Sequence, residues 1–241
     1  MTNRLNYELR RSRRRTLTVE VDQFGNVVVR APLHLSQRLI EHFVQSKADW
    51  ITQNLRNVEA KRQLVPQRTD IFDFYHCGQV LRWGWSNADV IVPQRVTTVL
   101  AALRWVERWQ RDCAHSVLSG HIDGFLPSIG LPALRYTGLQ LRRMRKRWGA
   151  CTNTGKITLN EVLIRVPDGC QRSVVAHEVC HLVHLNHGPG FRQLLDDVFP
   201  ENRLADAVLD AWSGQTDVFE QISSNAVVKD AAIISGDLPS M

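Results

Sequence analysis

The sequence predicts an α+β fold, in which a small antiparallel sheet and several helices follow an α+β N-terminal subdomain. Some short stretches alternate apolar and polar residues, as half-buried strands do. Other, longer stretches repeat their apolar residues every three or four positions, as amphipathic helices do. The 241 residues are 44% hydrophobic and 22% charged, which is typical of globular proteins and argues against global disorder.

A β-hairpin is expected near the start of the chain. Residues Thr16–Val21 alternate in polarity, and the run Val27–Arg30 is rich in β-branched side chains. Between them, the segment Asp22–Asn26 contains a glycine and two residue types that favour turns. The two runs are therefore expected to pair across this turn.

One long amphipathic helix is expected after the hairpin. Ser36 can cap its N-terminus, and apolar residues recur at helical spacing as far as about Leu64. Glycines, two tryptophans and a β-branched run over Gly78–Val92 then predict a second hairpin. We expect this hairpin to close an N-terminal subdomain of residues 1–95.

The second half opens with another long helix, because apolar residues return to helical spacing over Thr97–Leu118. Alternation over Leu134–Leu141 and a short run at Lys156–Leu159 predict strands, the second of which follows a turn at Thr152–Gly155. These strands are expected to form the edge of an antiparallel sheet.

A further helix is expected to begin at Asp168 or Ser173, either of which can cap it. The sequence Gly188–Gly190 then interrupts the chain before another short helix. These elements predict a second domain over residues 96–212. Because the residues that follow are polar and small, we expect 213–241 to be a loosely ordered tail.

The cysteines and the apolar segments indicate a cellular compartment. Five cysteines without any paired CxxC spacing argue against a disulfide framework and against a four-cysteine zinc site. No stretch has the ~20 apolar residues of a membrane span, and the N-terminus has no apolar core of a signal peptide. The expected location is a reducing cytoplasm, with no membrane partner.

The pattern His177-Glu178-Val179-Cys180-His181 contains the residues that are expected to bind a metal ion and to act in catalysis. Residues four apart on a helix share one face, so both imidazoles can reach a single zinc ion. Glu178 is adjacent and can act as general base toward a water molecule on the metal. His184 is interpreted as a surface or supporting residue, and Cys180 as a small buried apolar residue.

A catalytic zinc ion takes three protein ligands and keeps one open position, so a third ligand is required. His187 lies six residues after His181, just before the Gly-Pro-Gly sequence that allows the chain to turn. The competing third ligands are carboxylates one helix later, namely Asp196, Asp197 and Glu201. We expect one zinc ion on His177, His181 and His187, although other divalent metals fit the same ligands.

The chain resembles the YgjP-like metallopeptidase family over roughly residues 9–200. The resemblance rests on the catalytic block and on parts of the N-terminal region: Arg11–Arg15, Val27–Pro32, Lys47–Ile51, Lys146–Cys151, Ile157–Asn160, Leu163, Ile164, Pro167, Val174–Glu178, Asn186, His187 and Phe191. It implies a minimal zincin fold related to SprT-like proteases, with 96–212 as the zincin-like catalytic domain. It also implies His177, His181 and His187 as ligands and Glu178 as the base.

Two arginine-rich segments contribute to a formal net charge of +6, Arg10–Arg15 and Arg142–Arg147. Solvated strand faces are one interpretation, and contact with nucleic acid is another for the first segment. The second segment precedes the catalytic block and can form a basic rim that holds phosphates or an anionic substrate. The candidate substrate-binding residues are Arg142, Arg143, Arg145, Arg147 and Asn160, of which Asn160 can also orient a turn.

Three functions are compatible with these residues. The first is a zinc-dependent metallopeptidase that acts on a peptide or protein substrate. The second is a metal-dependent nucleoside triphosphate pyrophosphatase that uses the same site and the adjacent arginine cluster, an attribution that some YgjP-like proteins carry. The third is a nucleic-acid-binding module with a structural zinc ion, which is disfavoured because no paired cysteines supply a fourth ligand.

Overall fold

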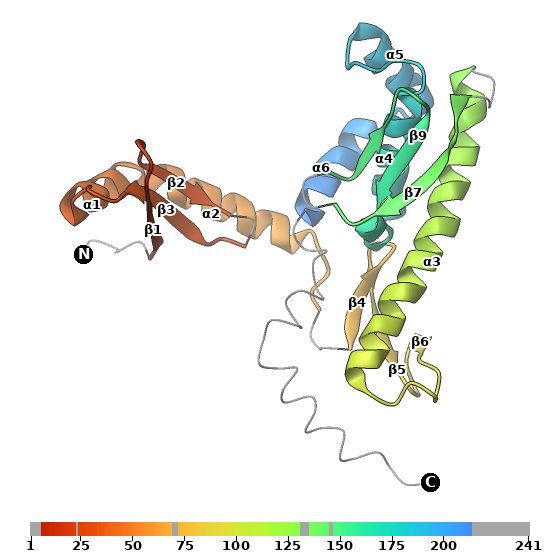
Figure 1. Cartoon of the computed structure of the whole chain (residues 1–241), viewed down its shortest axis with the longest axis horizontal. Coiled ribbons are helices and arrows are strands. Elements are labelled where there is room, and N and C mark those ends of the chain that lie inside the picture. The colour runs from red at the N-terminus through yellow and green to blue at the C-terminus, as the bar shows by residue number, and fades with distance from the viewer. Residues whose placement is uncertain (1–5, 23, 69–71, 131–134, 145–146, 214–241) are drawn as a thin grey trace. The chain divides into compact units, whose positions relative to one another are not determined.

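The structure, a computed structural model, describes residues 6–22, 24–68, 72–130, 135–144 and 147–213. Helices and small sheets form an α+β fold, as predicted (Figure 1). The chain divides into two compact units, Met1–Val65 and Pro66–Met241. Most of the tail expected over 213–241 lies outside the described residues. In the described part of the chain, no helix is both long enough and apolar enough to cross a membrane.

The first unit contains a three-stranded sheet and two helices. Its elements are β1 (Glu8–Ser12), β2 (Thr18–Val21), β3 (Val27–Pro32), α1 (Gln37–Ser46) and α2 (Ala48–Gln63). The predicted hairpin is confirmed, since β2 pairs with β3 in antiparallel register, while β1 pairs with the other edge of β3 in parallel. Val29, Ile40 and Ile51 are fully buried in the core of this unit.

The single long helix predicted from Ser36 to Leu64 is wrong, because the helix is interrupted at Lys47. Ser36 does cap α1, and its side chain accepts a hydrogen bond from the Leu39 amide. At the other end, the Ser46 hydroxyl donates to the Phe43 carbonyl at 2.7 Å. Such a serine bond competes with the helical ladder and bends helices, which a pattern of apolar residues does not reveal.

The second unit begins with a hairpin of β4 (Asp73–His76) and β5 (Gln79–Gly84). The two turn residues have positive φ, as a tight hairpin turn requires. The hairpin expected over Gly78–Val92 is therefore shifted, and β6 (Val90–Ile91) pairs with β5 in parallel. Phe74 and Trp83 pack against α3 (Val99–Phe125). These contacts explain why the division between units falls earlier than residue 95.

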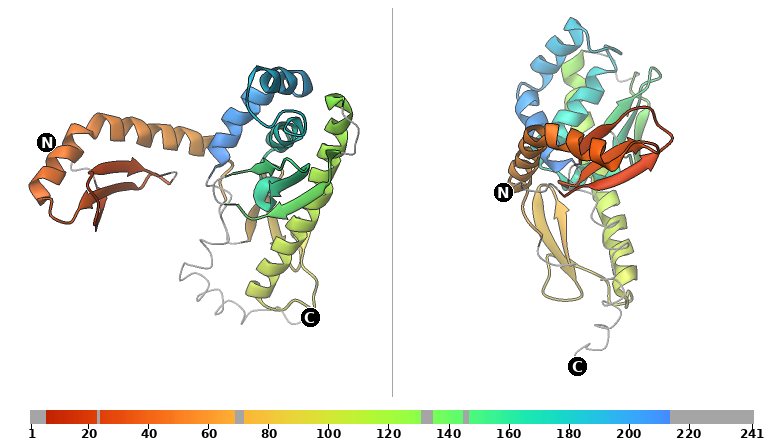
Figure 2. Two further views of the ribbon diagram at one scale, coloured as in Figure 1. Left: turned by 45° about the horizontal axis from the view of Figure 1, so that its top comes forward. Right: turned by 90° about the vertical axis from the view of Figure 1, so that its left-hand side faces the viewer.

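A third sheet, in the second unit, has the strand order β7-β9-β8. Its strands are green in Figure 2. It consists of β7 (Gly138–Arg142), β8 (Gly149–Cys151) and β9 (Lys156–Asn160). β8 and β9 are antiparallel, but β7 and β9 are parallel, so the prediction of a wholly antiparallel sheet is wrong. β9 lies in the centre, because the β8–β9 turn places β8 on one edge and β7 pairs with the opposite edge.

The remaining helices follow a 3₁₀ segment, η3 (Glu161–Arg165), and the earlier 3₁₀ turn η1 (Leu126–Ile129) follows α3. They are α4 (Asp168–Cys180), α5 (Pro189–Val198) and α6 (Asn202–Trp212). Pro167 occupies the N-cap position of α4, so neither Asp168 nor Ser173 caps it. Ser173 lies within the helix and donates to Asp206 in α6. Since α4 packs against α3, α5, α6 and β8, nine of its 13 residues are buried.

Replacing Gly155 by alanine is expected to destabilise the second unit by at least ~2 kcal/mol. Its φ of +82° disfavours any side chain, and a methyl group would overlap the Arg135 carbonyl oxygen. Urea denaturation measures the free energy of unfolding. The matched control is Gly124→Ala in α3, which meets nothing within 4 Å and should be neutral or stabilising. Equal stability of the two variants would contradict the strain assigned to Gly155.

Candidate metal centre

The last turn of α4 carries the first residues of the site. His177 and Glu178 lie within the helix, and His181 is its C-cap, with α-helical backbone angles and an amide that bonds the His177 carbonyl. The helical path therefore continues through the two histidines, and their side chains share one face. The chain then leaves the helix and returns through His187, just before Gly188 at the N-cap of α5.

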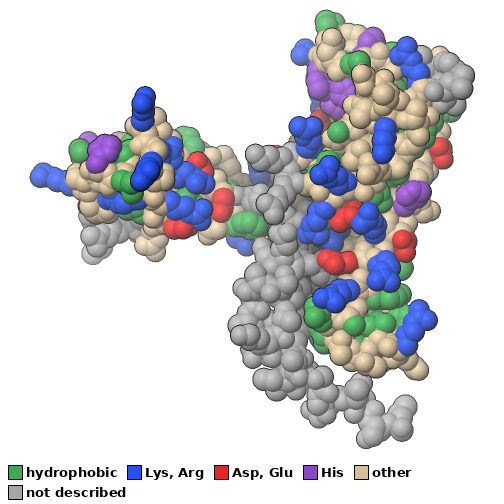
Figure 3. Space-filling view, viewed as in Figure 1, with side chains coloured by type: hydrophobic (Ala, Val, Ile, Leu, Met, Phe, Trp, Pro, Cys, Tyr) green, Lys and Arg blue, Asp and Glu red, His purple; other side chains and the backbone are tan. Residues whose placement is uncertain are grey.

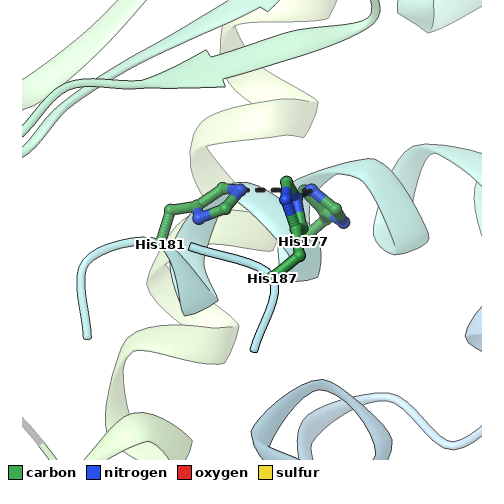
Figure 4. A group of neighbouring side chains, drawn as sticks. All are labelled: His177, His181 and His187. Carbon is green, nitrogen blue, oxygen red and sulfur yellow. Dashed lines mark hydrogen bonds between the residues drawn. The ribbon is translucent and has the colours of Figure 1, made fainter. Parts of the chain in front are cut away.

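The three imidazoles converge on a single point (Figure 4). The Nε2 atoms of His177 and His181 are 3.2 Å apart, and those of His177 and His187 are 3.0 Å apart. One ring nitrogen from each histidine lies within 4.8 Å of the other two. The structure thus brings together the three residues that the sequence suggested as metal ligands.

Hydrogen bonding and burial favour the ligating form of these rings. The Nδ1 of His181 lies 2.9 Å from the His184 carbonyl, which can only accept, so Nδ1 carries the proton and the Nε2 lone pair faces the other histidines. Burial, followed by the neighbouring histidines, lowers the pKa of His177 to about 4. His177 is consequently neutral at pH 7, as metal ligation requires.

Phe191 supports the triad from α5, and the sequence patterns did not assign it this role. Its ring centroid lies 4.9 Å from that of His177, 4.6 Å from that of His181 and 4.8 Å from that of His187. Phe191 is only 2% exposed. One buried ring therefore fixes all three imidazoles. The sequence signals were its place directly after the Gly-Pro-Gly turn and its inclusion in the family resemblance.

Glu178 is a buried carboxylate beneath β8. It is 6% exposed, and its Oε2 is buried without a hydrogen-bond partner among the described residues. Burial raises its pKa to about 7, against a smaller lowering effect of Arg147. A buried acceptor without a partner is costly and common at functional sites. The free-energy cost of keeping this oxygen buried without a partner is consistent with a proton-transfer role for Glu178.

Gly149 in β8 leaves the space that Glu178 occupies. A Cβ at this position would lie 2.5 Å from the Glu178 Oε1 and 2.6 Å from its Cγ. Any side chain at residue 149 would therefore displace the carboxylate. The sequence contained this glycine within the resemblance to the family, but its contact with Glu178 depends on packing between a strand and a helix.

The surrounding cysteines take no part in the triad. Cys180 is fully buried, and burial raises the pKa of its thiol to about 12. Burial and the nearby Glu178 raise the pKa of Cys151 to about 11. Both thiols therefore stay protonated at neutral pH and are poor metal ligands. This agrees with the interpretation of Cys180 as a small apolar residue.

The donor set fits a divalent ion. Among the described residues, the group of convergent ligand atoms consists of three histidines and contains no fourth protein ligand. This composition matches a catalytic zinc site, which leaves one position for water or substrate. Two of the competing carboxylates have other partners: Asp196 accepts from Asn202, and Asp197 accepts from Gln193.

The candidate substrate-binding residues are spread over several environments. Arg142 is exposed at the end of β7, Arg143 lines a different cavity, and Arg145 lies outside the described residues. Arg147 is exposed, and its positive charge has a lowering effect on the pKa of Glu178. Asn160 is 3% exposed, and its amide nitrogen donates to the backbone carbonyls of residues 144 and 147. It therefore orients the β7–β8 connection.

A cavity of about 450 Å³ opens beside His181. It is bounded by the β8–β9 turn, Thr152–Gly155, by the end of the helical segment, His181–Val183, and by Leu185 and Arg135. The Arg135 guanidinium donates to the Leu182 carbonyl at 3.1 Å. Of the three histidines, His181 is the one that lines this cavity.

Comparison with known proteins gives one extensive match. A family model described as YgjP-like, metallopeptidase domain, matches residues 15–211. A solved structure, the metallopeptidase zymogen abylysin of Pyrococcus abyssi, is 18% identical and covers 39% of this chain and 89% of its own, with a TM-score of 0.33. That score is too low to establish a shared fold. No curated protein is significantly similar in sequence.

Replacement of His177, His181 or His187 by alanine is expected to weaken zinc binding at least ~100-fold, because each removes one of three ligands. Zinc affinity can be measured by competition with a chromogenic chelator. His184→Ala is the matched control: it removes a nearby imidazole but keeps the carbonyl that bonds His181. Wild-type affinity in any of the three ligand variants would exclude that residue from the site.

Proposed function

The chain belongs to the YgjP-like metallopeptidase family, and on that premise we propose that it is a zinc-dependent peptidase that hydrolyses peptide bonds in a peptide or protein substrate. The observation that carries the proposal is the convergence of three imidazole nitrogens, two from the end of α4 and one from the segment before α5, next to a buried glutamate in α4. His177, His181 and His187 would hold the ion, and Glu178 would act as general base.

The ion, when bound, would polarise the scissile carbonyl and lower the pKa of a water molecule. The chain's own contribution is orientation and proton transfer. Phe191 and the His184 carbonyl fix the imidazoles. Glu178 Oε2, which has no hydrogen-bond partner among the described residues, would accept a proton from water and deliver it to the nitrogen of the leaving amine.

The same geometry favours a peptidase over the two alternatives. A structural zinc site would be closed by a fourth protein ligand, and the described residues supply three. A nucleotide hydrolase would need the arginines at the metal, but Arg143 lines a cavity that shares no residue with the triad. The cavity beside His181 has hydroxyl, amide, backbone and apolar groups that suit a peptide, and its arginine, Arg135, donates to the Leu182 carbonyl.

Glu178→Gln is expected to lower kcat/KM by about 10²- to 10⁴-fold, because an amide cannot accept the proton. Zinc affinity should stay near wild type, since the three imidazoles remain. Activity can be followed on a fluorogenic peptide library with the zinc-loaded protein. Undiminished cleavage by the variant, at full zinc occupancy, would rule Glu178 out as the base.

Gly149→Ala is expected to lower kcat by about 10²-fold, because the added methyl group displaces the Glu178 carboxylate. KM and zinc affinity should change little, since the methyl group is directed at Glu178. Gly169→Ala, at the start of α4 with open space around it, is the control for an added methyl group. If both alanine variants have the wild-type kcat, the position of Glu178 is not set by Gly149.

A further inference from the structure

A second cavity, of about 250 Å³, lies in the second unit between α3, η3 and the chain after β7. We call it the arginine pocket. Five arginines line it, together with Glu107 and Glu161: Arg104, Arg108, Arg111, Arg143 and Arg165. The lining therefore has a formal excess of three positive charges. In Figure 3, basic side chains gather around a few acidic ones over this part of the second unit.

Helical spacing concentrates three of these charges on one face. Arg104, Arg108 and Arg111 stand at positions i, i+4 and i+7 of α3, so they point to the same side. Like charges at this spacing destabilise a helix. Arg111 is paired with Glu161, at 3.2 Å between Nη1 and Oε2. Glu107 lies four residues before Arg111 on the same helix, so the acidic residues neutralise part of this face. A bound anion would balance the positive charge that remains.

The floor of the arginine pocket is rigid. Arg165 is 4% exposed, and its Nε donates to Gln110 Oε1 at 3.1 Å. Gln110 is 2% exposed and in turn donates to the Tyr75 carbonyl at 2.6 Å. A buried guanidinium is expensive to maintain and must be well coordinated. A network of buried polar groups therefore holds one cation in a fixed position at the base of the cavity.

We propose that the arginine pocket binds the phosphoryl groups of a compact, multiply charged ligand, of which inorganic pyrophosphate is the simplest example. The planar guanidinium fork matches phosphate oxygens in bidentate geometry. Several arginines around one small concavity suit an anion with more than one charge. A floor formed by buried Arg165 suits a small group that enters a pocket, rather than the flat surface of a duplex.

This site is independent of the proposed peptidase activity, because its lining contains none of the three histidines and not Glu178. Its test is a binding measurement that needs no substrate turnover. Isothermal titration calorimetry of the full chain with inorganic pyrophosphate should show one saturable site that weakens as salt is raised. No saturable binding at low salt would overturn the proposal.

The double variant Arg104→Ala/Arg108→Ala is expected to raise the Kd for pyrophosphate at least roughly tenfold. Arg165→Met tests the buried arginine at the base of the pocket, and circular dichroism reports whether this variant folds. If it does not fold, the double variant still tests the proposal. The control is Arg203→Ala, which removes an exposed arginine from α6. If the control loses as much affinity for pyrophosphate as the double variant, the effect comes from net charge alone, and the proposal is overturned.

Three further probes identify the source of the phosphoryl group. Tripolyphosphate that binds more tightly than pyrophosphate supports a soluble ligand. The second probe is vesicles of phosphatidylcholine with and without a phosphoinositide. If the protein binds only the vesicles that contain the phosphoinositide, and does so through Arg104 and Arg108, the phosphoryl group belongs to a lipid headgroup. Binding of single-stranded DNA through these arginines, with no binding of pyrophosphate, would contradict a compact ligand and overturn the proposal.

Discussion

The site depends on one constraint: three imidazole nitrogens must face one another without protons between them. At 3.0 and 3.2 Å between Nε2 atoms, two facing lone pairs would repel each other, so either a proton on one ring nitrogen or a bound cation must lie between adjacent rings. Burial of His177 lowers its pKa to about 4 and so disfavours its charged form, and the hydrogen bond from the His181 Nδ1 to a backbone carbonyl leaves the Nε2 of His181 without a proton. The surrounding structure maintains this unfavourable arrangement.

The buried helix α4 supplies the required rigidity. It is covered by α3, α5, α6 and β8, so its last turn cannot shift without disturbing a close-packed core. Glu178 shares this constraint, because β8 covers it and Gly149 leaves it just enough space. The triad and the carboxylate thus belong to one packed body. Their relative positions are set before any ligand binds, which is the condition for effective proton transfer.

The sequence could predict the features that depend on local geometry. The spacing of His177 and His181 is a property of any helix, and the Ser36 cap and the β2–β3 hairpin also follow from neighbouring residues. The sequence did not predict contacts between residues that are far apart in the chain. The parallel pairing of β7 with β9 and the contact of Phe191 with three imidazoles depend on tertiary packing, which no periodicity in the chain specifies.

The arginines illustrate the same difference between sequence and space. The sequence draws attention to the contiguous run Arg142–Arg147 because its charges are adjacent in the chain. In the structure, the connection that contains this run is tied down by Asn160, and Arg143 joins arginines from α3 and η3. Charge density in three dimensions follows helix faces and element packing. A basic site therefore has to be recognised from residues that converge: here three arginines share one face of α3, and Arg143 and Arg165 join them from other segments.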